Sequence, residues 1–189
     1  MSLPRLLVLT DRTQCRDGLT AAVAAAVDAG ARAVVLREKD LPSTERAVLA
    51  GELRRLLDPV GGQLVVAGGR GGEAVHLAAR DPFPSPRPRL VGRSCHGAAE
   101  VARAAGEGCD WAFVSPVFPT ASKPGYGPAL GLAGLAALVP LGPPVYALGG
   151  IGPDRVAGCL SAGARGVAVM GTVMRDPASV RDLLAALGD

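Results

Sequence analysis

The sequence is poor in aromatic residues and has no apolar run long enough to span a membrane. Phe, Trp and Tyr make up 3% of the 189 residues, and the net charge at neutral pH is only +3. Nucleic-acid-binding chains usually offer aromatic stacking surfaces or a dense basic stripe, and neither is present. The N-terminal segment lacks the long apolar region of a signal peptide. We therefore expect a cytoplasmic protein that binds neither nucleic acid nor a membrane.

Motifs for several common chemistries are also missing. The four cysteines have no Cys-x-x-Cys spacing, which predicts reduced, apolar side chains and not a metal site or a disulfide framework. No serine lies in a Gly-x-Ser-x-Gly motif, and residues 10–13 carry no Gly-x-Gly-x-x-Gly fingerprint. Nucleophile-elbow hydrolases and dinucleotide-binding folds are therefore disfavoured.

The sequence does contain a regular alternation of short apolar runs and amphipathic segments. Strands are expected at residues 5–10, 33–37, 63–67, 74–77, 90–94, 110–115, 144–148 and 166–170. Helices are expected at residues 19–29, 44–57, 98–105, 130–138, 154–161 and 178–187. This alternation predicts an α/β fold in which residues 1–189 form a single (β/α)₈ TIM-barrel domain, and it disfavours an open doubly wound sheet.

Two βα units of this barrel are shortened, in the region of residues 68–89. Residues 68–73 are mostly glycine, and residues 82–89 are rich in proline. Neither composition suits a regular helix, so we expect a thin barrel wall on this side.

Charged residues follow the second predicted strand. Arg37 and Lys39 are two residues apart on an extended segment, so both side chains can point into the mouth of the barrel. Two cations there suit a phosphate or a diphosphate. In the alternative interpretation, they pair with Glu38 and Asp40 in a solvated charge cluster.

Phosphate-binding loops are predicted after the last two strands. Gly149, Gly150, Gly171 and Thr172 follow the seventh and eighth strands, where this fold often binds phosphate, and glycine lets backbone N–H groups approach an anion closely.

The loop after the sixth strand adds Thr120, Ser122 and Lys123, whose hydroxyls and ammonium could also bind an anion. The alternative interpretation is an ordinary polar surface loop.

The two histidines, His76 and His96, both close predicted strands. Either could transfer protons as a general acid or base, or hydrogen-bond in a purely structural role.

Taken together, these motifs resemble the thiamine phosphate synthase/TenI family over nearly the whole chain. The matching segments are residues 6–11, 36–41, 75–77, 92–96, 116–124, 147–151 and 162–169. The resemblance implies a TIM barrel, commonly a dimer, that binds a thiazole phosphate. It implies that Gly149, Gly150 and Gly171 hold the phosphate, that Thr120, Ser122 and Lys123 lie over the ligand, and that Arg37 and Lys39 meet a diphosphate. By the same resemblance, Asp81 occupies the place of a Mg²⁺-binding aspartate.

The chain departs from this family's patterns at several positions. Val35 stands where the synthase pattern has glutamine, and residues 67–70 replace an Asn-Asp-Arg motif whose aspartate helps to hold Mg²⁺. Pro116 stands where tautomerases of the TenI branch have a histidine, whereas residues 92–94 are similar to that branch.

We interpret the chain first as a TenI-like thiazole tautomerase that needs no cofactor, with His76, His96, Lys39 and Lys123 as candidate catalytic residues. The alternatives are a Mg²⁺-dependent thiamine phosphate synthase and a non-catalytic phosphate-ligand-binding or regulatory protein.

Overall fold

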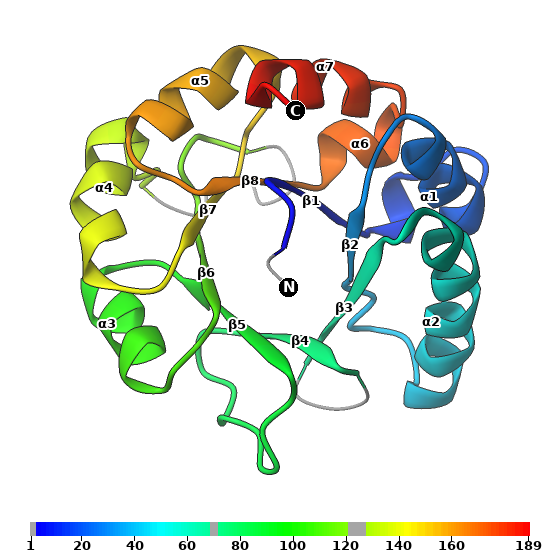
Figure 1. Cartoon of the computed structure of the whole chain (residues 1–189), viewed down its shortest axis with the longest axis horizontal. Helices are drawn as coiled ribbons and strands as arrows, with labels where there is room; N and C mark the ends of the chain where they lie inside the picture. The colour runs from blue at the N-terminus through cyan, green and yellow to red at the C-terminus, as the bar shows by residue number, and fades with distance from the viewer. Residues whose placement is uncertain (1–2, 69–71, 121–127) are drawn as a thin grey trace.

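Eight parallel strands close into a barrel in the computed structural model, which describes residues 3–68, 72–120 and 128–189 (Figure 1). Each strand pairs with the next one in sequence, and β8 pairs with β1, so the predicted TIM barrel is confirmed. The strands are β1 (Leu6–Leu9), β2 (Ala33–Leu36), β3 (Gln63–Ala67), β4 (Ala74–Leu77), β5 (Leu90–Cys95), β6 (Trp111–Val114), β7 (Val145–Leu148) and β8 (Gly166–Val169).

Helices surround most of this barrel (Figure 1). They are α1 (Leu19–Asp28), α2 (Ser43–Leu57), α3 (Ala98–Gly106), α4 (Gly131–Leu138), α5 (Pro153–Ser161), α6 (Gly171–Arg175) and α7 (Ser179–Leu187). The sequence analysis missed α6, because five residues are too short to show a helical period. Among the described residues, no helix follows β3 or β4, as the glycine- and proline-rich links predicted.

The strands bury both faces, as expected for a parallel sheet covered by helices. Side chains of alternate strand residues point into the barrel or toward the helices, and these two sets form separate apolar clusters. Trp111 fills the barrel interior beside Gly92, where a Cβ would lie 2.0 Å from the indole ring. Glycine at position 92 is therefore required by the packing of this large side chain.

Arg93 supports the segment that replaces a helix after β4. Its guanidinium is fully buried, donates to the carbonyls of Ala78, Ala79 and Asp81, and pairs at 2.6 Å with Glu107, which directly follows the C-terminal end of α3. A buried charge is tolerated when it is paired and hydrogen-bonded, so this side chain can fix a segment that does not form a helix.

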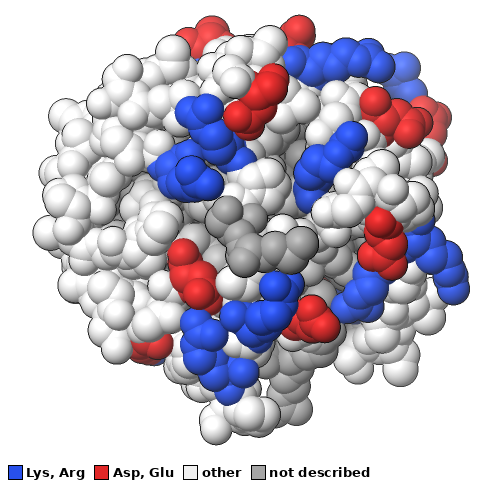
Figure 2. All heavy atoms as spheres, viewed as in Figure 1, with Lys and Arg blue, Asp and Glu red and all other residues white. Residues whose placement is uncertain are grey.

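The described segment that precedes β1 lies near the middle of one end of the barrel (Figure 1). On this face, basic side chains are interspersed with acidic ones, and they do not merge into one basic surface (Figure 2). Among the helices of the described residues, none is long and apolar enough to cross a membrane.

Candidate functional site

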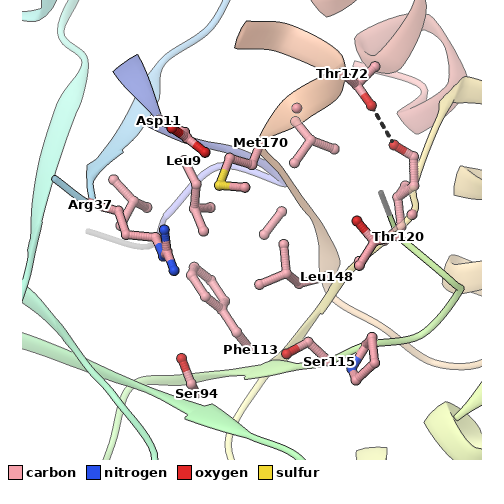
Figure 3. A pocket seen from close by; sticks show the side chains of 18 of the residues that line it. Leu9, Asp11, Arg37, Ser94, Phe113, Ser115, Thr120, Leu148, Met170 and Thr172 are labelled. Carbon is pink, nitrogen blue, oxygen red and sulfur yellow. Dashed lines mark hydrogen bonds between the residues drawn. The ribbon is translucent and has the colours of Figure 1, made fainter. Parts of the chain in front are cut away.

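A cavity of about 590 Å³ opens at the carboxyl ends of the strands. Its apolar wall includes Leu9, Phe113 and Leu148, which point inward from β1, β6 and β7 (Figure 3). Arg37 and Thr172 lie on opposite sides of this wall (Figure 3). The small side chains of Ala67 and Ala168 leave this end of the barrel unfilled. The cavity therefore offers an apolar middle between two polar sides, which suits a flat organic ring bearing anionic groups.

Arg37 and Lys39 both line this cavity, on the side formed by the loop after β2. Glu38 and Asp40 do not pair with them, because both carboxylates bind Arg12 instead, at 3.0 and 2.5 Å. The hydrogen bond from Arg12 holds the pKa of Asp40 at about 2. Within the described part of the chain, neither Arg37 nor Lys39 forms an ion pair, so the alternative of a self-contained charge cluster is wrong.

The opposite side of the cavity is formed by the backbone of residues 149–152, which we call the glycine cup. Here the carbonyl groups of residues 149–151 accept hydrogen bonds from donors outside the loop, and that of Gly150 accepts from the Arg155 side chain at 2.6 Å. The Gly149 carbonyl accepts from the Phe118 N–H at 3.1 Å, and the Ile151 carbonyl accepts from the Thr172 hydroxyl at 3.1 Å (Figure 3). In a trans peptide, the N–H group points away from the carbonyl. The N–H groups of residues 150–152 accordingly point away from these donors, and they meet no acceptor among the described residues.

Both glycines of this cup are required by their surroundings. Gly149 and Gly150 have φ angles of 102° and 63°, in the region that favours glycine. A Cβ on Gly150 would lie 2.3 Å from the Pro119 carbonyl oxygen. Backbone N–H groups in such a turn form a concave anion-binding site, which is the property predicted for these loops.

The loop after β8 completes this side of the cavity. Gly171 and Thr172 line it at the start of α6, and Thr120 lines it from the loop after β6 (Figure 3). Ser122 and Lys123 were predicted to join them, but both lie outside the described residues.

His76 lies at the inner end of the cavity and is almost fully buried. Its ring stacks on Phe113, with centroids 3.9 Å apart, and its Nε2 atom lies 2.9 Å from the Ser94 hydroxyl. Burial, with smaller contributions from Lys39, Arg93 and Arg37, lowers the pKa of His76 to about 3. This imidazole is therefore neutral at pH 7 and a weak proton acceptor.

His96, the second predicted histidine, lines the cavity at the end of β5. Its Nδ1 atom lies 2.7 Å from the Ser115 carbonyl oxygen, which can only accept a hydrogen bond. The proton must therefore be on Nδ1, and in the neutral ring Nε2 carries the lone pair. Of the two histidines, His96 has the geometry better suited to accepting a proton.

The described residues do not form a Mg²⁺ site. Asp81 does not line the cavity, and its carboxylate accepts the N–H of Ala78 at 2.8 Å. Nowhere in residues 3–68, 72–120 and 128–189 do three His, Cys, Asp or Glu side chains gather as metal ligands. Because Mg²⁺ needs several oxygen ligands in octahedral geometry, Asp81 as placed does not supply the site expected from the resemblance.

The structure adds charged cavity residues that the sequence analysis missed. Arg155 and Arg175 line the cavity beside the glycine cup, and Asp11 lines it after β1. Burial raises the pKa of Asp11, but hydrogen bonds from Thr13 and Gln14 outweigh this effect, and its pKa lies below the usual value. The arginines lie on helices, where the sequence offers no signal that separates them from other surface arginines.

Comparisons with known proteins agree with this geometry. The family model described as thiamine monophosphate synthase matches residues 6–173. A protein from Geobacter sulfurreducens, provisionally named a thiamine-phosphate synthase, is 40% identical, over 96% of this chain and 93% of its own. A thiamine-phosphate synthase from Methanoculleus marisnigri is 35% identical, over 96% and 95%. The solved structure of a thiamine phosphate pyrophosphorylase from Pyrococcus furiosus superposes with a TM-score of 0.84 at 27% identity, over 97% of this chain and 95% of that one.

Proposed function

The chain belongs to the thiamine monophosphate synthase family, and on that premise we propose that it is a thiamine-phosphate synthase. The reaction would join a hydroxymethylpyrimidine diphosphate to a thiazole phosphate and release diphosphate. The relatives' names support this alternative, and not the tautomerase that the sequence analysis favoured.

One observation carries the proposal. The cations Arg37 and Lys39 lie on one side of an apolar cavity, and the backbone N–H groups of the glycine cup lie on the opposite side (Figure 3). The glycine cup suits the phosphate of the thiazole, and Arg37 and Lys39 suit the diphosphate of the pyrimidine. A tautomerase acting on a thiazole carboxylate phosphate would bring only a single carboxylate charge to the second region, whereas a diphosphate has the charge and the oxygens to engage both Arg37 and Lys39.

In the proposed mechanism, the thiazole nitrogen attacks the methylene carbon of the pyrimidine. A carbon–nitrogen bond forms with the nitrogen lone pair while the bond from carbon to the diphosphate oxygen breaks. No base is needed, because the attacking nitrogen carries no proton. Arg37 and Lys39 stabilise the negative charge that develops on the leaving diphosphate, and fixed cations in a partly water-excluded cavity do this effectively.

The test is an assay with both substrates and Mg²⁺ that follows thiamine phosphate and diphosphate together. Arg37→Gln and Lys39→Gln should each lower kcat/KM by about a hundredfold, the usual effect of removing one stabilising donor. Arg181→Gln is the matched control, because Arg181 is exposed on α7 and lies outside the cavity. Wild-type protein that binds both substrates without forming thiamine phosphate would refute the proposal.

The tautomerase remains the second candidate because of one observation, the 2.7 Å contact between the Nδ1 atom of His96 and the Ser115 carbonyl oxygen. That arrangement leaves Nε2 as the proton acceptor of the neutral ring. Proton exchange at the thiazole ring carbon, followed by NMR in deuterated water, separates the two activities. A tautomerase should lose exchange in His96→Gln, whereas the synthase mechanism requires no proton transfer from this residue.

A further inference from the structure

Arg155 is attached to the glycine cup by its side chain. Its Nη1 atom donates to the carbonyl of Gly150 at 2.6 Å, and its guanidinium stacks over the ring of Phe118 at 4.7 Å from the centroid. Asp154 lies 3.6 Å from its Nε atom. The Phe118 and Gly150 contacts hold the guanidinium at the rim of the cavity, and Nη2 has no hydrogen-bond partner among the described residues.

Arg175 occupies the corresponding position beside the loop after β8. Its Nη1 atom donates to the side-chain oxygen of Gln14 at 2.5 Å. The same atom lies 2.6 Å from the point where a Cβ on Gly171 would be, so the guanidinium folds back over the start of α6. Arg175 therefore lines the cavity at the loop after β8, whereas Arg155 lines it at the loop after β7.

We propose that these two side chains, the arginine bracket, bind the phosphoryl group of the ligand held by the loops after β7 and β8. The bracket makes this site selective for a phosphate monoester dianion over the corresponding uncharged alcohol. This inference rests on the proposed function, because it takes the ligand to be the thiazole phosphate.

The argument for selectivity comes from the charges around the cup. Backbone N–H groups bind an oxyanion only through their own partial positive charges. A guanidinium adds a full positive charge, and its planar set of N–H donors matches the spacing of phosphate oxygens. Each arginine uses Nη1 on the protein, which leaves further N–H donors for a ligand. A ligand without negative charge forms no ion pair with the bracket, so it gains little from the two guanidinium groups.

Arg155 has a second effect, on the shape of the cup. By holding the Gly150 carbonyl, it sets the orientation of the peptide that carries the Ile151 N–H, which must point the opposite way. Lysine at this position would keep the charge, but it would lose the planar stacking on Phe118.

The test compares calorimetric binding of thiazole phosphate and of the unphosphorylated thiazole alcohol in the absence of the pyrimidine substrate. Arg155→Gln and Arg175→Gln should each raise the Kd for thiazole phosphate about tenfold, and the double variant about a hundredfold. The Kd for the alcohol should not change in any of them. Arg155→Lys should lie between the wild type and Arg155→Gln, and Arg181→Gln should match the wild type for both ligands.

Two outcomes would overturn the arginine bracket. One is an unchanged Kd for thiazole phosphate in the double variant, which would mean that the backbone cup suffices. The other is an equal loss of affinity for phosphate and alcohol, which would mean that the substitutions disturb the cavity as a whole. The binding measurement uses no second substrate, so it is independent of synthase turnover. A protein that discriminates between the two ligands but shows no turnover would count against the proposed function and not against the arginine bracket.

Discussion

The substitution Gly150→Ala tests the close approach on which the glycine cup depends. Gly150 has a φ of 63°, and a Cβ there would lie 2.3 Å from the Pro119 carbonyl oxygen. Gly61 is a matched control, because its φ is 64° and a Cβ there would meet nothing within 4 Å. Both substitutions share the conformational cost of a left-handed alanine, and only one of them adds a backbone clash.

The magnitude follows from these two terms. A left-handed conformation costs alanine about 1–2 kcal/mol, offset by roughly 0.4–1 kcal/mol from the stiffer unfolded chain. Gly61→Ala should therefore lower the free energy of unfolding by about 0.5–1 kcal/mol. Displacing the Pro119 backbone adds about 1–3 kcal/mol, as for overpacking in a core. For a domain of this size, a total of about 2–4 kcal/mol corresponds to a fall in Tm of roughly 4–15 °C.

Thermal unfolding followed by circular dichroism measures both variants under the same conditions. Gly150→Ala should also raise the KM for thiazole phosphate, because the displaced loop misaligns the N–H groups of the cup, whereas Gly61→Ala should leave KM unchanged. If the two variants lose the same Tm, the close approach to Pro119 does not constrain the cup and the reasoning is wrong.

Other predictions concern buried charges and the residues that hold the cations in place. Because the folded pKa of His76 is about 3 and the unfolded value about 6.5, its contribution to stability is complete above pH 6.5 and is lost as the pH falls toward 3. The free energy of unfolding, measured with urea, should fall between pH 7 and pH 4.5 by on the order of 2 kcal/mol more in the wild type than in His76→Asn. An equal fall in the two proteins would contradict the assigned burial. Arg93→Ala should destabilise the fold by about 3–5 kcal/mol, because it leaves Glu107 and buried carbonyls unpaired, and chemical denaturation with a wild-type m-value measures this loss. Arg12→Gln removes the ion pairs that hold Asp40 and Glu38, so that Asp40 above all can compete for Arg37 and Lys39, and the KM for the pyrimidine diphosphate should rise while that for thiazole phosphate stays the same.

The alternation of apolar runs was sufficient to predict the barrel, and the reason is local. Strands buried on both faces must be apolar throughout, and amphipathic helices must show a period near 3.6, so each element is encoded in its own residues. The structure places most element ends within one or two residues of the prediction. The short helix α6 was missed because five residues cannot display a period.

The candidate site was predictable to the extent that it depends on strand ends. Arg37, His76, Gly149 and Gly171 were expected around one mouth of the barrel, and all of them line the same cavity. This follows because the order of parallel strands fixes which loops share a face. The roles of these residues remain predictions for the binding and kinetic experiments.

The sequence by itself determined the barrel and the loops that carry polar groups, because both depend on short-range patterns. Only the tertiary structure decided which partners those groups have. Arg12 pairs with the carboxylates beside Arg37, and Asp81 turns its carboxylate back to the Ala78 N–H. Arg155 stacks on a ring from another loop, and His76 loses its basicity through burial. Hydrogen bonds, ion pairs and desolvation join residues that are distant in sequence, and so they depend on the folded arrangement as a whole.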